Sequence, residues 1–269
     1  MRVNLIIAAF ILFIISSCKE SDRDEDKTFH TSTDVAFSTN LVYDIFKTFY
    51  QAANYTQGIV TNNTTDSISV YGCDTIFKDT TSNPKWLKIQ FNSGCTSEGI
   101  TRSGKIYSTF DSYFDITGAT ATLILDDFNY GAFKVYYGTI TIKNEGLIDS
   151  IPNYTIQFNE VKIINNFSQR INYSGTHQLK IIQGGNTQTI VDDIYSITGS
   201  NSGRVFKGNG FTSQIITALN LNGNCNWICS GVVTVKPENI PTRTLDFGSG
   251  CDKSISITVY ETKNNVEIP

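Results

Sequence analysis

The chain has 269 residues, a formal net charge of −4, five prolines, one methionine and two histidines. Lysine and arginine are scattered among acidic residues instead of clustered, which excludes nucleic acid as a partner. Threonine, serine, asparagine, tyrosine, phenylalanine and isoleucine are frequent, as in secreted β-rich proteins, and the length suits one large sheet or barrel domain.

Residues 1–17 have the organisation of a lipoprotein signal peptide. Arg2 precedes an apolar run from Leu5 to Ile15, and two serines lead to Cys18. This order of charge, apolar core and small residues is typical of a secretory signal, and a cysteine at the first mature position carries the lipid. An uncleaved transmembrane helix is the alternative, but the run is shorter than the ~20 apolar residues that span a bilayer. We therefore expect lipidation at Cys18.

Residues 18–30 are expected to form an acidic tether. Five acidic and three basic residues occupy 19–27, without one apolar side chain, so the segment cannot bury enough surface to fold. Cys18 followed by Lys19, Glu20 and an acidic cluster resembles the surface-export signal of Bacteroidota lipoproteins. The resemblance implies an outer-membrane lipoprotein of unassigned function that faces the cell exterior. Anchoring that faces the periplasm is the alternative.

Residues 31–269 are expected to form a single β-rich domain that begins with a helix at about 33–55. Apolar residues recur there at three- and four-residue spacing, and Thr33 or Asp34 is the candidate N-terminal cap. Binding to a membrane surface is a competing use of such a helix, but no basic face accompanies the apolar one. The apolar positions are Val35, Leu41, Val42, Ile45, Phe46, Phe49, Tyr50 and Ala53.

From about Ser67 the chain is expected to form short antiparallel strands. Period-two runs such as 139–143 and 154–158 alternate apolar and polar residues, and turn signals recur at 129–131, 184–186, 222–223 and 264–265. No helix-length pattern intervenes, which excludes βαβ units. The predicted fold is mainly β, a large curved antiparallel meander packed on the N-terminal helix. A two-sheet β-sandwich is the alternative.

Four cysteines are expected to form two disulfides, because export permits them. The segment that ends at Cys95 and the one that ends at Cys251 share Phe, Ser, Gly and Cys, and each follows an earlier cysteine. Cys73 with Cys95, and Cys225 with Cys251, are each symmetric about a proline-containing turn. In such hairpins the partners would lie directly opposite each other.

Cys229 is left over, and a buried thiol is the simplest interpretation. Metal ligation by Cys225 and Cys229 is the alternative, but no histidine or second thiol pair lies nearby in the sequence. We therefore predict neither a metal nor another cofactor.

Catalytic motifs are scarce, and we predict no catalytic residue. His177 is the only histidine beyond the tether and helix start, its surroundings favour a surface turn, and no Gly-x-Ser-x-Gly elbow occurs. Two acids suffice for glycoside hydrolysis, so one acid each from Asp126-Asp127 and Asp192-Asp193 could converge across the sheet. An acidic strand end explains each doublet equally well.

A binding module for a glycan or a protein is the function that the sequence favours. Exposed aromatic side chains could stack on sugar rings, although cross-strand packing is their commoner use. A structural component of an outer-membrane assembly, with edge strands completed by partners, is the alternative. The candidate aromatics are Trp86, Tyr107, Tyr113, Tyr130, Tyr136 and Tyr137.

Four short segments resemble the Asp-Ser/Thr-apolar O-glycan acceptor of exported Bacteroidota proteins. The resemblance implies modification at one or more of their hydroxyl residues. These are Ser67, Thr75, Thr80 and Ser150.

Overall fold

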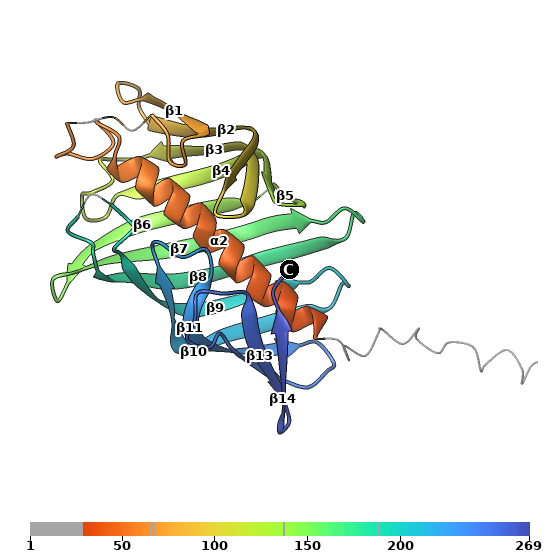
Figure 1. Cartoon of the computed structure of the whole chain (residues 1–269). Coiled ribbons are helices and arrows are strands. Elements are labelled where there is room, and N and C mark those ends of the chain that lie inside the picture. The colour runs from red at the N-terminus through yellow and green to blue at the C-terminus, as the bar shows by residue number, and fades with distance from the viewer. Residues whose placement is uncertain (1–28, 65, 67, 137, 188) are drawn as a thin grey trace, which may run out of the picture.

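A computed structural model describes residues 29–269 except 65, 67, 137 and 188. In this part of the chain, one α-helix lies across a fourteen-stranded antiparallel sheet (Figure 1). The predicted fold, a large meander packed on an N-terminal helix, is therefore confirmed. Cys18 and the acidic tether up to residue 28 lie outside the described residues.

The helix α2 spans His30–Asn54, and the apolar residues predicted for it are all buried. The predicted cap is wrong. Phe29 is the N-cap residue and makes no side-chain cap bond. Asp34 instead accepts a hydrogen bond from the backbone N–H of Phe206 (3.1 Å), so a contact with the sheet region uses the carboxylate that a local cap would need.

The strands follow one another along the sheet as a meander, with one irregularity. The short strand β5 and the strand β6 share one position, since both pair with β4 on one side and β7 on the other. The strands are β1 (Asp74–Asp79), β2 (Lys85–Ser97), β3 (Ile100–Phe110), β4 (Thr120–Tyr130), β5 (Phe133–Tyr136), β6 (Thr139–Ile148), β7 (Ile151–Ile164), β8 (Arg170–Gln183), β9 (Ile194–Arg204), β10 (Gly210–Asn222), β11 (Ile228–Pro237), β12 (Arg243–Asp246), β13 (Ser254–Val259) and β14 (Thr262–Glu267).

Alternation along the strands separates a buried face from an exposed one. The two runs with predicted period-two patterning pair with each other, so that Ile140 opposes Phe158 and Ile142 opposes Ile156. All four side chains are buried on the helix side, whereas their neighbours in sequence are more exposed. The meander therefore buries one face against α2 and leaves the other to solvent.

The sheet curves around the helix. The helix contacts β2 near one end of the sheet and β11 and β12 near the other (Figure 1). Of its 25 residues, only four are not buried, so the helix is enclosed on all sides instead of lying on a flat layer. A single helix with polar residues on its second face is stable in this position only if each polar side chain finds a partner.

Several buried polar side chains of α2 find partners outside the helix, whereas the buried Ser32 Oγ has none among the described residues. Asn40 donates to the carbonyl of Asn226 (2.9 Å) and accepts from the N–H of Ile228 (3.1 Å). Seven residues later, Lys47 donates to the carbonyl of Cys225. These bonds attach the loop before β11 to two points on the helix.

A turn at residues 131–132 joins β4 to β5, next to the predicted 129–131, but the turn expected at 264–265 is wrong. Asn264 and Asn265 lie inside β14 and pair with Ile257 and Ser256. The reversal occurs instead after β13, where Tyr260 takes a positive φ of 53°. The pairing of β13 with β14 overrides the local turn preference of two asparagines.

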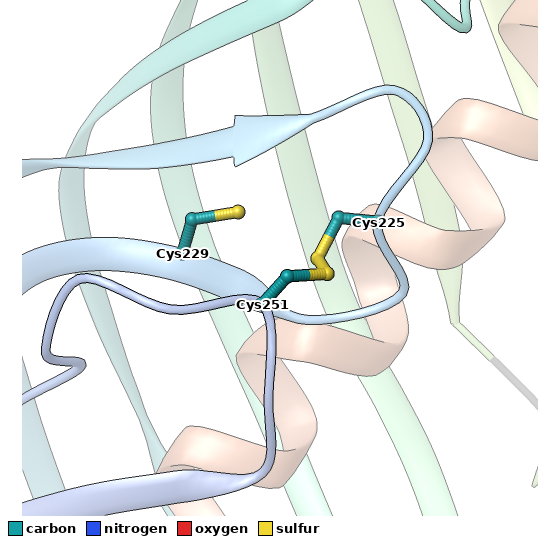
Figure 2. Close-up of side chains that lie close together, drawn as sticks. All are labelled: Cys225, Cys229 and Cys251. Atoms are coloured by element: carbon teal, nitrogen blue, oxygen red, sulfur yellow. A yellow bond between two sulfur atoms is a disulfide. The ribbon is translucent and has the colours of Figure 1, made fainter.

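Both predicted disulfides are present. The Cα–Cα distance is 5.2 Å for Cys73–Cys95 and 5.9 Å for Cys225–Cys251, and Figure 2 shows the second bridge. Their predicted placement directly opposite in hairpins is wrong. Asp74 pairs with Phe91, and a bulge between Phe91 and Cys95 brings Cys95 to Cys73. Cys225 and Cys251 lie in loops outside the strands. Cys229 is a free, buried thiol, as predicted.

Candidate functional site

A pocket of about 600 Å³ lies at the C-terminal end of α2. Five parts of the chain form it, and we call it the helix-end pocket. They are the last helical turn, the loop that follows, the β3–β4 loop, the facing parts of β6 and β7, and the β8–β9 loop. The lining residues are Tyr50, Asn54, Val60, Asn62, Asn63, Asp115, Thr117, Asn144, Gly146, Leu147, Pro152, Tyr154, Gly185, Asn186 and Thr187.

Side-chain hydrogen bonds hold the loops around this pocket. Both oxygens of Asp115 accept from the backbone N–H of Thr61, at 2.9 and 3.0 Å. Asn144 donates to the carbonyl of Phe114 (2.9 Å) and accepts from the N–H of Gly146 (2.8 Å). The lining is therefore organised before any ligand binds, which reduces the entropy lost on binding.

The end of the helix is part of this arrangement. Asn63 donates to the carbonyl of Asn54, the last helical residue, at 3.0 Å. Carbonyl groups at a helix C-terminus carry a partial negative charge. Together with Asp115 they make the pocket unfavourable for anions, and no Lys, Arg or His occurs among the described residues that line it.

Two tyrosines form the aromatic part of the lining. The hydroxyl groups of Tyr50 and Tyr154 lie 3.3 Å apart, and their ring centroids are 5.5 Å apart in an edge-on arrangement. Burial raises the pKa of both phenols above the ordinary value, so both remain neutral hydrogen-bonding groups. Neutral hydroxyls next to carboxamides suit a ligand that carries hydroxyl groups of its own.

Asp193 is a buried carboxyl group next to the pocket lining. Its Oδ2 accepts a hydrogen bond from the Tyr195 hydroxyl (2.7 Å), and its Oδ1 has no partner among the described residues. A Cβ built on Gly184 would lie 2.5 Å from that Oδ1, which places the carboxyl against the loop that contributes Gly185 to the pocket. Burial raises the pKa of Asp193 to about 6.

His177 contradicts the prediction of a surface turn. It lies in the middle of β8 and is fully buried, with its Nδ1 hydrogen-bonded to the Tyr43 hydroxyl of the helix. Burial lowers its pKa to about 4, so the imidazole is neutral. The surrounding Ser, Gly and Thr suggested a turn, but Gly199 on β9 leaves the space that this ring fills, since a Cβ there would lie 2.6 Å from Cδ2.

The two acidic doublets do not supply a pair of carboxylates. Asp127 is exposed and forms an ion pair with Lys134 at 2.6 Å. Asp193 is buried and bonded to Tyr195, as described above. Each carboxylate has its own surroundings, and the convergence that a glycosidase of this type requires does not occur between them.

The candidate aromatic side chains do not gather at one site. Trp86 and Tyr107 come together on the exposed face of the sheet, with ring centroids 5.7 Å apart. Tyr130 is buried near Arg102, and Lys85 covers the ring of Tyr113 at 4.5 Å. Tyr136 borders a hollow on the outer side of β4 and β6, and Tyr137 lies outside the described residues.

The predicted O-glycan acceptors differ in exposure. Ser150 is exposed at the tip of the β6–β7 hairpin. Thr75 in β1 and Thr80 just after it are half-buried, and Thr80 packs against Gly58, where a Cβ would lie 2.8 Å away. Ser67 lies outside the described residues. Modification of these residues stays a prediction, and Ser150 is the most accessible of the described three.

The residues that line the helix-end pocket were not anticipated from the sequence. Asn62, Asn63 and Asn186 occur in segments that had only a turn or loop character. The one signal in the sequence that could have indicated them is the recurrence of asparagine in the loop after the helix and in the β8–β9 loop. Their convergence follows from the curvature of the sheet, which no local pattern encodes.

Comparison of the chain with known protein families, curated proteins and solved structures gives no match. Within the described residues, no helix has both the length and the hydropathy needed to cross a membrane.

Proposed function

We propose that this protein is a lipid-anchored binding module of the outer membrane that faces the cell exterior and holds a neutral glycan in its helix-end pocket. The observation that carries the proposal is the convergence of five chain segments on a pre-organised pocket lined by carboxamides, hydroxyls and two tyrosines. Sugars offer dense hydroxyl groups to such a lining, and their apolar faces pack on aromatic rings.

Charge narrows the ligand class. Asp115 and the C-terminal carbonyls of α2 disfavour phosphorylated, sulfated or uronic acid ligands, and the described lining offers no cation to offset them. A neutral oligosaccharide meets no such penalty. The predicted lipid at Cys18 and the tether up to residue 30 would hold the pocket away from the membrane.

Binding to a panel of neutral and acidic oligosaccharides tests the proposal, with the variants Asn62→Ala and Asn186→Ala as probes. Both side chains line the pocket at exposed positions, so their removal affects ligand contacts more than folding. We expect each variant to weaken binding of a neutral glycan about five- to tenfold, since a neutral hydrogen bond contributes about 1 kcal/mol. Equal binding by both variants and the native protein would contradict the assignment.

The anchoring part of the proposal has its own experiment. In the native host, Cys18→Ala should abolish incorporation of labelled fatty acid and release the protein from the membrane fraction. Neutralising the acidic residues between 19 and 27 should reduce digestion by protease added to whole cells. Unchanged surface display of the neutralised variant would contradict the assignment of an export signal, but it would not bear on the assignment of the pocket.

A structural role in an envelope assembly is the alternative, and the edges of the sheet bear on it. An edge strand that recruits a partner strand is long, flat and uncharged, whereas charged edges oppose such pairing. The edge strand β1 carries Asp74, Lys78 and Asp79, and the edge strand β14 carries Lys263 and Glu267. Both edges therefore favour a self-contained domain over strand addition.

A further inference from the structure

Three cysteine sulfurs gather at one end of the domain. Cys225 and Cys251 are joined by a disulfide, Cys229 is a free buried thiol, and the three Sγ atoms all lie within 4.8 Å of one another (Figure 2). The other disulfide, Cys73–Cys95, has no such neighbour, since Cys229 is the only free cysteine among the described residues.

The sulfur atoms of Cys229 and Cys225 share a neighbouring atom. The sulfurs of Cys225 and Cys229 lie 3.1 and 3.5 Å from the same atom, the carbonyl oxygen of Trp227. Cys225 lies in the loop before β11, and Cys229 is the second residue of that strand. Hydrogen bonds to Asn40 and Lys47 attach this segment to the helix. The two sulfurs are therefore held near each other by bonds that do not depend on the disulfide.

The three cysteines differ in solvent exposure, and this difference decides which sulfur of the disulfide leaves more easily as a thiolate. Cys225 and Cys229 are buried, whereas Cys251 is exposed. A thiolate is better solvated in water than in an apolar surrounding, so Cys251 is the better leaving group of the bridge.

A cation lies close to this cluster. Lys47 of α2 is buried, and its pKa is lowered by desolvation, while the charges of Asp44, Glu98 and Cys229 act in the opposite direction. The thiolate is the form of a cysteine that attacks a disulfide.

We propose that Cys225, Cys229 and Cys251 form a thiol–disulfide exchange site that transfers the free thiol from buried Cys229 to exposed Cys251. The Cys229 thiol loses its proton and its sulfur bonds to Cys225 Sγ, while the Cys225–Cys251 bond breaks and Cys251 leaves as a thiolate that takes up a proton. One disulfide and one thiol are present before and after, so no external oxidant or reductant is required.

The exposed Cys251 thiolate can then attack an organic disulfide, R–S–S–R. The products are the mixed disulfide of Cys251 with one R–S group and one released thiolate, so electrons balance here as well. The site thereby offers covalent attachment to a small disulfide or to a disulfide-bearing protein at the surface of the domain.

Labelling of the native, unreduced full-length mature protein with a maleimide at pH 8, followed by peptide mapping, tests the proposal. We expect label on Cys251 together with a new Cys225–Cys229 bridge, accumulating over minutes to hours as uncatalysed disulfide rearrangement does. In Cys229→Ser, labelling at Cys251 should fall at least tenfold. Label on Cys229 with the Cys225–Cys251 bridge intact, label on Cys225, or no label without denaturation would each overturn the proposal.

A second variant, Cys251→Ser, tests the proposal even if Cys229→Ser does not fold. Cys251→Ser removes an exposed side chain and leaves Cys225 and Cys229 free to pair. In air this variant should lose two hydrogens, seen by intact mass, and mapping should place the bridge between Cys225 and Cys229. Two persistent thiols in a folded Cys251→Ser protein would show that the two sulfurs cannot bond, which contradicts the exchange.

Discussion

Asp44 on the enclosed helix and Arg102 on β3 form an ion pair from which water is excluded. Arg102 donates from Nε to Oδ2 of Asp44 (2.9 Å) and from Nη2 to Oδ1 (2.5 Å), and each side chain is 1 % exposed. The rings of Tyr71 and Tyr130 lie 4.6 and 5.6 Å from the guanidinium. This pair fixes the rotation of α2 relative to the sheet, because a helix turned or shifted by one residue would leave both charges unpaired.

Replacing Asp44 by alanine is expected to destabilise the protein by about 3 to 5 kcal/mol, because Arg102 would then be a buried charge without a counter-ion. Urea denaturation measures the change. The double variant Asp44→Leu/Arg102→Met, which removes both charges, should regain most of the loss. A single variant that is as stable as the native protein would mean that water reaches Arg102.

Asp193→Asn is expected to stabilise the protein at pH 8, on the order of 2 kcal/mol. The folded-state pKa of Asp193 is about 6, above the ordinary value of about 4, so the folded state favours the protonated acid. The contribution of Asp193 to the free energy of unfolding is therefore fully present below pH ~4, and it is lost as the pH rises through about 6. Asparagine keeps an acceptor for Tyr195 and does not ionise. Denaturation midpoints that differ by the same amount at pH 3.5 and pH 8 would contradict this.

His177 has the opposite effect on the pH dependence of stability. Its folded-state pKa is about 4, below the ordinary value of about 6.5, so the folded state favours the neutral ring. Its contribution is present above pH ~6.5 and is lost as the pH falls through about 4. His177→Gln is expected to lower stability at pH 7 through lost packing, yet to lose less than the native protein between pH 6.5 and 4, by about 3 kcal/mol. Parallel pH profiles for the two proteins would show that His177 does not titrate in this range.

The Cys73–Cys95 bridge closes the end of the β1–β2 hairpin and should stabilise the protein by roughly 3 kcal/mol. The double variant Cys73→Ser/Cys95→Ser, measured against native protein in the absence of reductant, tests this value. Because β1 is an edge strand, hydrogen exchange should accelerate in β1 before it does in β8. Equal acceleration across the sheet would show that the bridge stabilises the whole fold and not the edge.

The periodic features of this fold could be predicted from the sequence because period-two alternation and helical spacing are local. Ile140 and Ile142 lie on the buried face that their alternation indicates, and Phe46 and Phe49 lie on the buried helix. The disulfide partners could be predicted because a repeated segment marks each pair, although the bulge before Cys95 could not.

The properties that depend on curvature could not be predicted in this way. A buried position for His177 requires Tyr43 and Gly199 to surround it, and these residues are distant in sequence. The same holds for the helix-end pocket, which Asn62 and Asn186 both line only because the sheet closes around the end of α2. Local patterns report which face of a strand is buried, not how far the sheet bends.

Ligand binding to a blocked pocket tests the central claim most directly. Asn186→Trp places a large side chain at the helix-end pocket, and Gln183→Trp adds the same side chain at an exposed position three residues earlier that does not line it. Calorimetric titration of the native protein with the neutral oligosaccharide selected from the panel is predicted to give binding that Asn186→Trp reduces at least tenfold and Gln183→Trp leaves unchanged. Equal binding by all three proteins, or equal loss in both variants, would contradict the assignment of the helix-end pocket as the ligand site.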